Sequence, residues 1–351
     1  PRATADIQPA APSVERLDDL CGLLLRRGQP QLRGAVESFP GYSQLLGVQG
    51  EVLGRVVAAL GVQPAQAKHT DGEGVLTLQS LQPGAAAILL RSYRAPAAAA
   101  TAGLPAPPAL RTMTQSFAHY GMPDGSVRIY SKTSISPPVF WPTPQLDIEI
   151  GGTEQSLILY AALAPRSALS TDLPYLHRYY DQPPPAVQQQ QDGGHTGSSN
   201  NNSNGGSGSG SGSDLPSFKQ LEAEARKEEG FTPFVSPSLW VRAMAVGALC
   251  FTVPWQGGRD AGVMEAVRRY STTLTDIWLA HLLADARTYA GSDEPASDGG
   301  PDPSGQRARW RQAAEVLRNH VRHDPMTSLL YPVYGEPQVV KLIETVAGDL
   351  A

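Results

Sequence analysis

A run of closely spaced strand-like segments constrains the fold more than any other feature of this chain. Segment 126–135 follows segment 112–120 across the turn sequence MPDGS, so the two are expected to form a hairpin. Segment 156–163 follows segment 145–150 across two glycines and a few polar residues, which is again typical of a hairpin turn. So many adjacent hairpins favour an antiparallel sheet. Two further strand signals precede them, at 74–81 and 87–94.

Helical patterns stand before and after these strands. Ser13 can cap a helix that ends near Gly28. Segment 238–253, SLWVRAMAVGALCFTV, is predicted as one long strand or a pair of strands. A block of strands flanked by helices predicts an α+β fold, in which helices cover both faces of an antiparallel sheet. The other helices are predicted at 50–61, 215–229, roughly 260–290, 306–322 and 336–347.

Length and composition limit the class of protein. The 351 residues can form one large domain or two smaller ones. Segment 183–214 is low in complexity and almost free of apolar side chains, so we predict a disordered insertion that need not separate two domains. The net charge of −5 argues against a dedicated nucleic-acid-binding protein, and no apolar run is long enough to span a membrane. Cys21 and Cys250 supply neither a disulfide scaffold nor a CxxC motif.

The beginning of the chain carries little information. It starts at Pro1 without Met, so an N-terminal targeting peptide can have been removed, although none is visible.

Two acidic residues alternate with apolar ones in QLDIEI, residues 145–150. Asp147 and Glu149 therefore point to one face of the predicted strand. Taken alone, this is an ordinary half-exposed strand. The neighbouring segment SLILYAAL is apolar at both parities, which is typical of a strand covered on both faces. A carboxyl group in a covered region needs a partner or holds its proton near neutral pH, so either residue is a candidate proton donor.

Cationic and aromatic side chains can meet these acids. Arg128, Tyr130 and Lys132 alternate along the preceding predicted strand. Arg242 adds another cation, with Trp240 at the same parity. Together they suggest a site for a flat, apolar ligand that carries carboxylate groups. For Arg128 and Lys132, simple cross-strand ion pairs are at least as good an interpretation.

Several motifs in a consistent order resemble one family, over roughly residues 112–351 apart from the low-complexity segment. The matching segments are FAHYGMPDGS (117–126), PQLDIEIGG (144–152), YLHRYYD (175–181), FTPFVSPSLWVRA (231–243) and YPVYGEPQVVKLIETVAGDL (331–350). In these segments the chain is similar to red chlorophyll catabolite reductase of the algal type, within the ferredoxin-dependent bilin reductase superfamily. The stretch DPMTSLLYPVYGE also resembles the wider superfamily's segment before its last helix.

The resemblance implies a single domain over 1–351 with an α/β/α sandwich fold. It implies reduction of the open-chain tetrapyrrole red chlorophyll catabolite to a primary fluorescent chlorophyll catabolite. Reduced ferredoxin would be the external electron donor, with no bound cofactor. It also implies the chloroplast stroma, reached with a transit peptide, and transient complexes with other chlorophyll-catabolic enzymes. Two alternatives stay open: a protein that binds linear tetrapyrroles without catalysis, and a reductase of another bilin.

The resemblance places the family's two catalytic carboxylates on Glu149 and Asp324. The predicted substrate-binding residues are Tyr130, Lys132, Trp240 and Arg242, proposed above from their alternation, and His119. The match to the family motif favours a pocket role for His119, and a structural role is equally plausible. Without the resemblance, Asp324 in HDPMTS is a turn and cap residue, because Asp-Pro commonly opens turns.

Two histidines stand close to that acid in the sequence. His320, His323 and Asp324 are clustered, but histidines at a helix C-terminus favour the helix dipole and no fourth ligand is evident. We therefore predict no metal.

An acidic ferredoxin needs a basic patch on this acidic chain. Segment 306–322 is expected to place four arginines on one helical stripe, next to an apolar face that packs inward. A solvated basic face that only aids solubility is the alternative. The predicted stripe consists of Arg307, Arg311, Arg318 and Arg322.

Overall fold

The computed structural model describes most of the region in which strands and helices were predicted. The predicted helix that begins at Ser13 and most of segment 183–214 lie outside the described residues. The described residues are Arg27, Pro30, 40–82, 85–95, 110–121, 126–138, 141–186, 214–256, 261–289 and 306–347.

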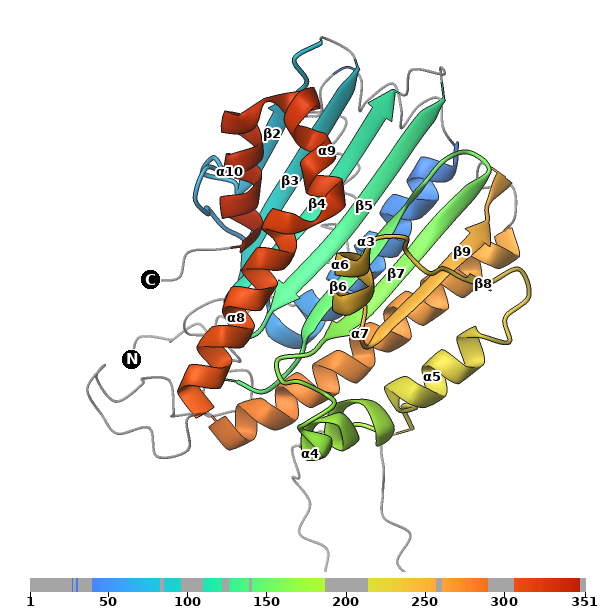
Figure 1. Ribbon diagram of the computed structural model, residues 1–351, viewed down its shortest axis with the longest axis vertical. Helices are drawn as coiled ribbons and strands as arrows, with labels where there is room; N and C mark the ends of the chain where they lie inside the picture. Colours follow the sequence, from blue (N-terminus) through green and yellow to red (C-terminus); the bar gives the residue numbers. More distant parts are fainter. Residues whose placement is uncertain are drawn as a thin grey trace, which may run out of the picture.

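The centre of the molecule is one antiparallel sheet, with strand order β1-β3-β4-β5-β6-β7-β9-β8 and β2 paired with β3 (Figure 1). All six strand segments predicted between 74 and 163 are present, and both predicted hairpins are confirmed. The strands are β1 Gln63–Pro64, β2 Val75–Gln79, β3 Ala86–Arg94, β4 Thr112–Gly121, β5 Val127–Ser136, β6 Gln145–Gly152, β7 Ser156–Ala164, β8 Thr232–Pro233 and β9 Ala248–Pro254.

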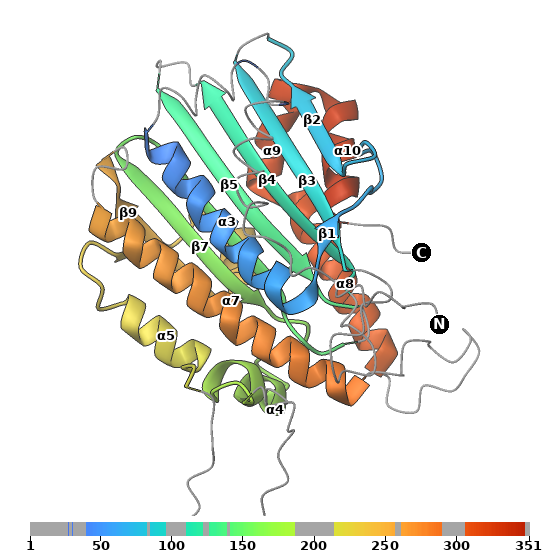
Figure 2. The same ribbon diagram turned by 180° about the vertical axis from the view of Figure 1, so that it is seen from behind.

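Helices cover both faces of the sheet, which confirms the α/β/α sandwich. The long helices α3 (Pro40–Leu60) and α7 (Ala261–Tyr289) cross one face, with α5 (Phe218–Ala225) beside them (Figure 2). The opposite face carries α8 (Gln306–His323), α9 (Pro325–Tyr334) and α10 (Glu336–Ala347), with the short α6 (Leu239–Met244) near β6 (Figure 1). A four-residue helix α4 (Leu173–Leu176) runs into a π-helical turn (His177–Asp181).

Each face of the sheet has its own hydrophobic core. Ile129, Ile148 and Leu159 belong to the larger core, which also contains the inner sides of α3 and α7. Leu90 and Ala118 belong to a smaller core with residues of α9 and α10. The smaller core lies at the β2–β4 side of the sheet, so polar side chains can occupy that same face farther along, over β5 and β6.

A buried side-chain amide of α3 is hydrogen-bonded to strands in the middle of the sheet. Gln49 of α3 is fully buried and donates to Ser131 Oγ at 3.3 Å and to the Ile148 carbonyl at 3.2 Å. The Gln115 side chain donates to the Gln49 carbonyl at 3.0 Å. Because a buried polar group is costly when unpaired, these bonds hold one position of α3 over β4, β5 and β6.

The prediction of a long strand over 238–253 was wrong in its first half. Ser238 accepts a hydrogen bond from the Val241 amide and caps α6, and the strand β9 begins only at Ala248. Gly247, with φ at +77°, lies between them in the left-handed region that glycine adopts without steric cost. An apolar run cannot by itself distinguish a short helix from a strand.

Two helical boundaries also differ from the prediction. The helix predicted at 50–61 is α3, which already begins at Pro40. The apolar run after Asp324 was expected to follow a turn, but it forms α9. Proline fits the first position of a helix because its missing N–H has no intrahelical partner there. Gly335, with φ at +78°, ends α9.

Candidate active site

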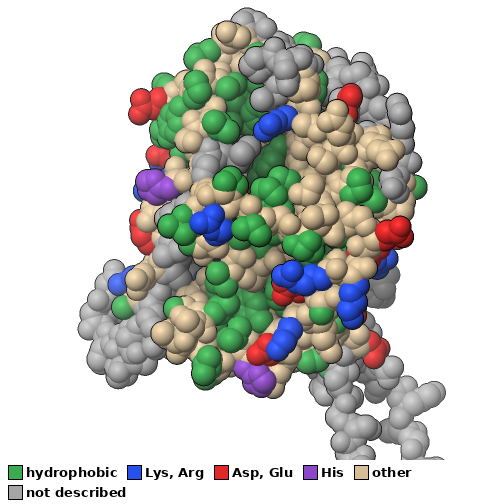
Figure 3. All heavy atoms as spheres, turned by 45° about the vertical axis from the view of Figure 1, so that its right-hand side comes forward, with side chains coloured by type: hydrophobic (Ala, Val, Ile, Leu, Met, Phe, Trp, Pro, Cys, Tyr) green, Lys and Arg blue, Asp and Glu red, His purple; other side chains and the backbone are tan. Residues whose placement is uncertain are grey.

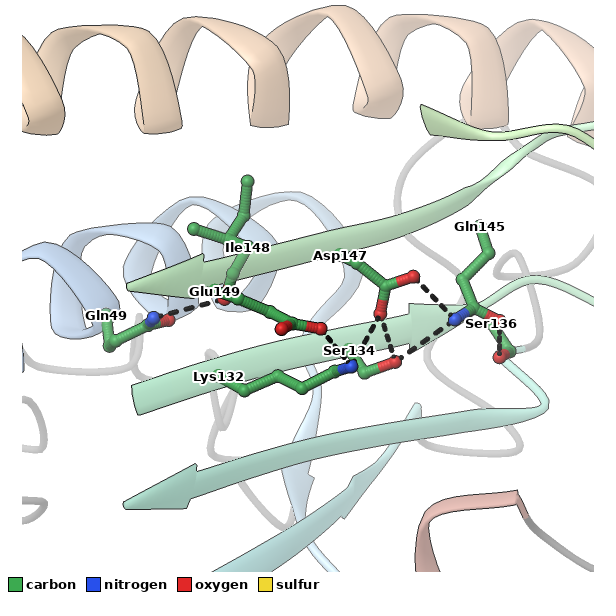
Figure 4. Close-up of polar contacts among 8 residues, drawn as sticks. All are labelled: Gln49, Lys132, Ser134, Ser136, Gln145, Asp147, Ile148 and Glu149. Atoms are coloured by element: carbon green, nitrogen blue, oxygen red, sulfur yellow. Dashed lines mark hydrogen bonds and ion pairs between the residues drawn. The ribbon is translucent and has the colours of Figure 1, made fainter. Parts of the chain in front are cut away.

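A row of polar side chains crosses β5 and β6 on the face that carries the C-terminal helices. The strands pair with Lys132 opposite Glu149 and Ser134 opposite Asp147. Because directly opposed residues share a face of the sheet, the two carboxylates and the ammonium come together. The sequence predicted their parity, and the strand register now places them side by side (Figure 4).

Lys132 lies within ion-pair distance of both carboxylates. Its Nζ forms an ion pair with Glu149 Oε1 and lies 3.9 Å from Asp147 Oδ1. The three side chains are poorly accessible to water, with exposed fractions of 15% for Lys132, 18% for Glu149 and 8% for Asp147. Burial lowers the pKa of the lysine, but the charges of Glu149 and Asp147 outweigh burial and raise that pKa above its ordinary value. The lysine is therefore a fixed cation of the site at neutral pH.

Asp147 is the more deeply engaged carboxylate. Ser134 Oγ donates to its Oδ1 at 2.6 Å, and Gln145 Nε2 donates to its Oδ2 at 2.7 Å (Figure 4). The Gln145 amide also contacts Ser134 Oγ at 3.2 Å and accepts from Ser136 Oγ at 2.9 Å. The network thus continues along both strands. It was not anticipated in this form, and the only sequence signal was the alternation in QLDIEI.

Asp324 reaches the same region from the helical layer. It stands between α8 and α9, is half-buried, and its main-chain carbonyl accepts the Ser328 amide at 3.1 Å. The residue is therefore a helix-start residue, as its sequence context also allowed. Its negative charge nevertheless acts on Lys132, Tyr130 and Tyr160, where it adds to effects that raise the pKa of each. The structure brings Asp324 within electrostatic range of the polar row.

Tyrosines frame the carboxylates. Tyr130 hydrogen-bonds Glu149, and burial followed by the charges of Glu149 and Asp324 raises its pKa far above the ordinary value. Tyr160 lies directly across from Glu149 on β7, and burial again is the main reason for its raised pKa. Both phenols therefore stay protonated and present O–H groups and ring faces to the site. This matches a site for an aromatic ligand.

His119 is separated from these residues. It pairs with Ala87 on one side and Ile129 on the other, and both belong to the core beneath α3. The hairpin register places Ala118, not His119, opposite Tyr130, so His119 lies on the other face of the sheet from Tyr130 and Lys132. Burial lowers the pKa of His119. These features agree with the alternative of a structural histidine.

Arg242 and Trp240 belong to α6, so their predicted strand parity was also wrong. Arg242 is exposed, and its Nη1 donates to the carbonyls of Ser236 at 2.8 Å and Pro237 at 3.0 Å. It lines a pocket of about 370 Å³ that Cys250 also lines. Cys250 pairs with Tyr160, which in turn pairs with Glu149, so one strand, β7, lies between this pocket and the polar row. The side chain of Trp240 lies outside the described residues.

The surface around this pocket is partly apolar. Val235 and Leu239 each expose 72% of their surface. Figure 3 shows hydrophobic side chains at the surface on this side of the molecule, with Lys and Arg side chains among them. An apolar surface beside a guanidinium can receive a ligand that combines an apolar body with an anionic group.

The predicted arginine stripe is only partly present on α8. Arg311 and Arg322 are exposed. Arg318 is half-buried and forms an ion pair with Glu315, and burial together with the charge of Arg322 lowers its pKa. Its side chain thus turns partly inward, which the idealised stripe did not anticipate. The side chain of Arg307 lies outside the described residues.

Within the described residues, no group of three or more His, Cys, Asp or Glu side chains is placed to hold a metal ion. The side chain of His320 is not among those described, and His323 is exposed. Among the helices in the described ranges, none combines the length and apolar character needed to cross a membrane.

Sequence reasoning missed one buried charge cluster on the other face. Asp285 of α7 is fully buried and accepts hydrogen bonds from Thr143 Oγ1, Arg178 Nη2 and, at 2.7 Å, Tyr179 OH. Burial raises the pKa of Asp285 even though the three donors oppose it. The cluster ties α7 to the π-helical turn. An aspartate within a long helix gives no sequence signal for such partners.

Comparisons with known proteins bear on the fold. No family model matches the chain, and neither does any curated protein sequence. Among solved structures, the chain is similar to phytochromobilin synthase from tomato, whose structure was determined in complex with biliverdin. The TM-score is 0.50 and the identity 14%, over 87% of this chain and 82% of that chain. At this identity the similarity shows the shared fold, an antiparallel sheet between helical layers, and nothing finer.

Proposed function

We propose that this chain reduces an open-chain tetrapyrrole, with reduced ferredoxin as electron donor. The observation that carries the proposal is the polar row on β5 and β6, where Lys132 holds Glu149 while Asp324 approaches from the helical layer. Two considerations support it: the fold similarity to a protein solved with biliverdin, itself a linear tetrapyrrole, and the short sequence motifs that resemble those of bilin reductases.

In the proposed reaction the protein has two tasks: it positions the pigment and it supplies protons to it. Reduction of a carbon–carbon double bond takes up two electrons, delivered one at a time by ferredoxin, and two protons. Glu149 and Asp324 are the proposed proton donors, one on the sheet and one at the start of α9. Tyr130 and Tyr160 would pack against the pigment and keep water away from the reacting carbons. No bound cofactor is needed in this scheme, which remains a prediction.

The carboxylate side chains of the pigment would be bound at the edge of the site. Arg242 lines the pocket on the far side of β7, and its exposed guanidinium can form a paired hydrogen bond with a carboxylate. The apolar surface of Val235 and Leu239 would cover part of the tetrapyrrole. Trp240 belongs to the same helix and remains a proposed contact.

The finer assignment follows the sequence resemblance. The proposed substrate is red chlorophyll catabolite, and the proposed product is a primary fluorescent chlorophyll catabolite. The proposed location is the chloroplast stroma, with transient contacts to other chlorophyll-catabolic enzymes. Ferredoxin is proposed to dock at the exposed arginines of α8, Arg311 and Arg322, because α8 leads directly to Asp324.

An anaerobic assay separates this proposal from its alternatives. The protein is mixed in turn with red chlorophyll catabolite and with biliverdin, each with reduced ferredoxin, and absorbance and fluorescence are followed. A fluorescent product from the first pigment, absent when ferredoxin is omitted, supports the proposal. Consumption of biliverdin alone indicates a reductase of another bilin. Spectral shifts on binding without turnover of either pigment would favour a tetrapyrrole-binding protein and contradict catalysis.

A further inference from the structure

The two carboxylates beside Lys132 are bound in different ways. Glu149 makes the closer ion pair with the ammonium, and its side chain is the more exposed, at 18% against 8% for Asp147. Each oxygen of Asp147 accepts a neutral hydrogen bond, from Ser134 and from Gln145. Asp147 is thus the less accessible of the two carboxylates, while Glu149, which also receives a hydrogen bond from Tyr130, is the more accessible one.

The ammonium position couples the two acids. Lys132 Nζ already lies within 3.9 Å of Asp147 Oδ1 while it contacts Glu149. A stronger pull from Asp147 moves the ammonium away from Glu149 and favours a proton on Glu149. Loss of the negative charge of Asp147 makes a proton on Glu149 less favourable. The ammonium then pairs with Glu149 as the only carboxylate of the two, and the repulsion between the two negative charges is gone.

We propose that Asp147 is a positioning residue, which shares Lys132 with Glu149 and so lets Glu149 carry the proton that it gives to the substrate. The inference rests on the proposed reductase function for its purpose. The coupling between the carboxylates is a property of the resting protein and can be measured without turnover.

Several other ionisable groups surround Glu149. The groups that act on this site come from every neighbouring element: Lys132 and Tyr130 on β5, Asp147 on β6, Tyr160 on β7, Cys250 on β9 and Asp324 before α9. Burial and then the charge of Glu149 raise the pKa of Cys250 to about 11, and both tyrosines also have raised pKa values. Near neutral pH, the carboxylates and Lys132 are therefore the groups whose charges matter.

The test compares two substitutions that act on Lys132 in opposite directions. Asp147→Asn removes the negative charge but keeps the shape, because Gln145 can turn its amide to match. Ser134→Ala keeps the charge and removes one donor, so Asp147 draws the ammonium more strongly. The protonation midpoint of Glu149 is followed by ¹³C NMR of glutamate-labelled protein without pigment, with Glu149→Gln to assign the signal.

Opposite shifts are expected. Asp147→Asn lowers the midpoint of Glu149 by roughly one pH unit, and Ser134→Ala raises it by a smaller amount. Asp147→Glu keeps the charge and restores most of the wild-type midpoint. Asp276→Asn, at a partly exposed ion pair on α7, leaves the midpoint of Glu149 unchanged. In turnover, the alkaline limb of the pH–rate profile moves to lower pH in Asp147→Asn, because a proton donor is active only while protonated.

Two results would overturn the inference: an unchanged midpoint in Asp147→Asn, or shifts of the same sign in the asparagine and alanine variants. Should Asp147→Asn fail to fold, the sign of the shift in Ser134→Ala decides alone. Opposite shifts in a protein that reduces no tetrapyrrole would leave the coupling intact and refute the proposed function. Reduction of a tetrapyrrole by a protein that shows no coupling would support the proposed function and refute the inference about Asp147.

Discussion

Replacement of Lys132 by methionine probes the centre of the site. Methionine keeps much of the apolar stem of lysine but removes the ammonium that lies between Glu149 and Asp147. Glu149 and Asp147 then lie side by side on β6 without a cation between them and with little access to water, at exposed fractions of 18% and 8%. Removal of one partner from a buried ion pair is far more costly than its replacement by an apolar pair, because the remaining charge stays buried.

The size of the effect follows from the burial. Breaking a buried ion pair costs about 3–5 kcal/mol, and the partial exposure of Lys132 and Glu149 places this case near the lower end, at about 3 kcal/mol. That lowers the ratio of folded to unfolded protein by more than about a hundredfold. The matched control is Lys219→Met. Lys219 pairs with Asp181 at 3.4 Å but exposes 73% of its side chain, so the expected cost is below about 1 kcal/mol.

Urea unfolding at several pH values measures both the size and the sign. The folded-state pKa of Lys132 is raised, so its stabilisation is complete below the unfolded pKa of lysine, about 10.4, and is lost only as the pH rises toward the folded value. The lysine therefore stays charged from about pH 5 to about pH 8. In Lys132→Met, protonation of either carboxylate relieves their repulsion. The stability gap between wild type and variant must shrink as the pH falls.

Two outcomes would refute this reasoning. One is a loss of stability in Lys132→Met no larger than in Lys219→Met. The other is a gap that widens on acidification. A third variant, Lys132→Met combined with Glu149→Gln, should recover most of the lost stability, because a neutral amide then takes the place of one buried charge.

Three further predictions concern other parts of the chain. Asp285→Ala should cost about 3 kcal/mol in urea unfolding, because it leaves the buried hydroxyls of Thr143 and Tyr179 and the half-exposed guanidinium of Arg178 without their acceptor. Asp276→Ala on the same helix breaks a partly exposed pair and should cost below about 1 kcal/mol. Deletion of 186–212 should leave the melting temperature and turnover nearly unchanged, and a fall of many degrees would contradict a disordered insertion. Charge reversal at Arg311 and Arg322 should raise the KM for ferredoxin and weaken its salt dependence with pigment binding intact, and unchanged KM at low salt would place the dock elsewhere.

The sheet could be predicted because its signals are local. The turn MPDGS joins β4 to β5, and the glycine pair joins β6 to β7, so hairpins follow from neighbouring residues. The helices α6 and α9 could not be predicted in this way. A Ser238 cap and a left-handed Gly247 divide one apolar run into helix and strand, and the same letters are compatible with a continuous strand.

The site could be predicted only as far as parity. Alternation in QLDIEI places Asp147 and Glu149 on one face, and that is independent of the partner strand. Which residues of β5 lie on the same face depends on the register of pairing, and a shift of one residue exchanges the two faces. That is why Lys132 could be proposed but not placed, and why the face on which His119 lies could not be predicted.

The most direct test of the central claim measures pigment binding and reduction separately in Glu149→Gln and Asp324→Asn. Each amide keeps the shape of the acid but cannot supply its proton. In single turnovers with pre-reduced ferredoxin, we expect pigment reduction to slow by about a hundredfold or more in each variant. Pigment affinity, read from the absorbance shift on binding, should change little. Reduction at the wild-type rate in both variants would contradict the account.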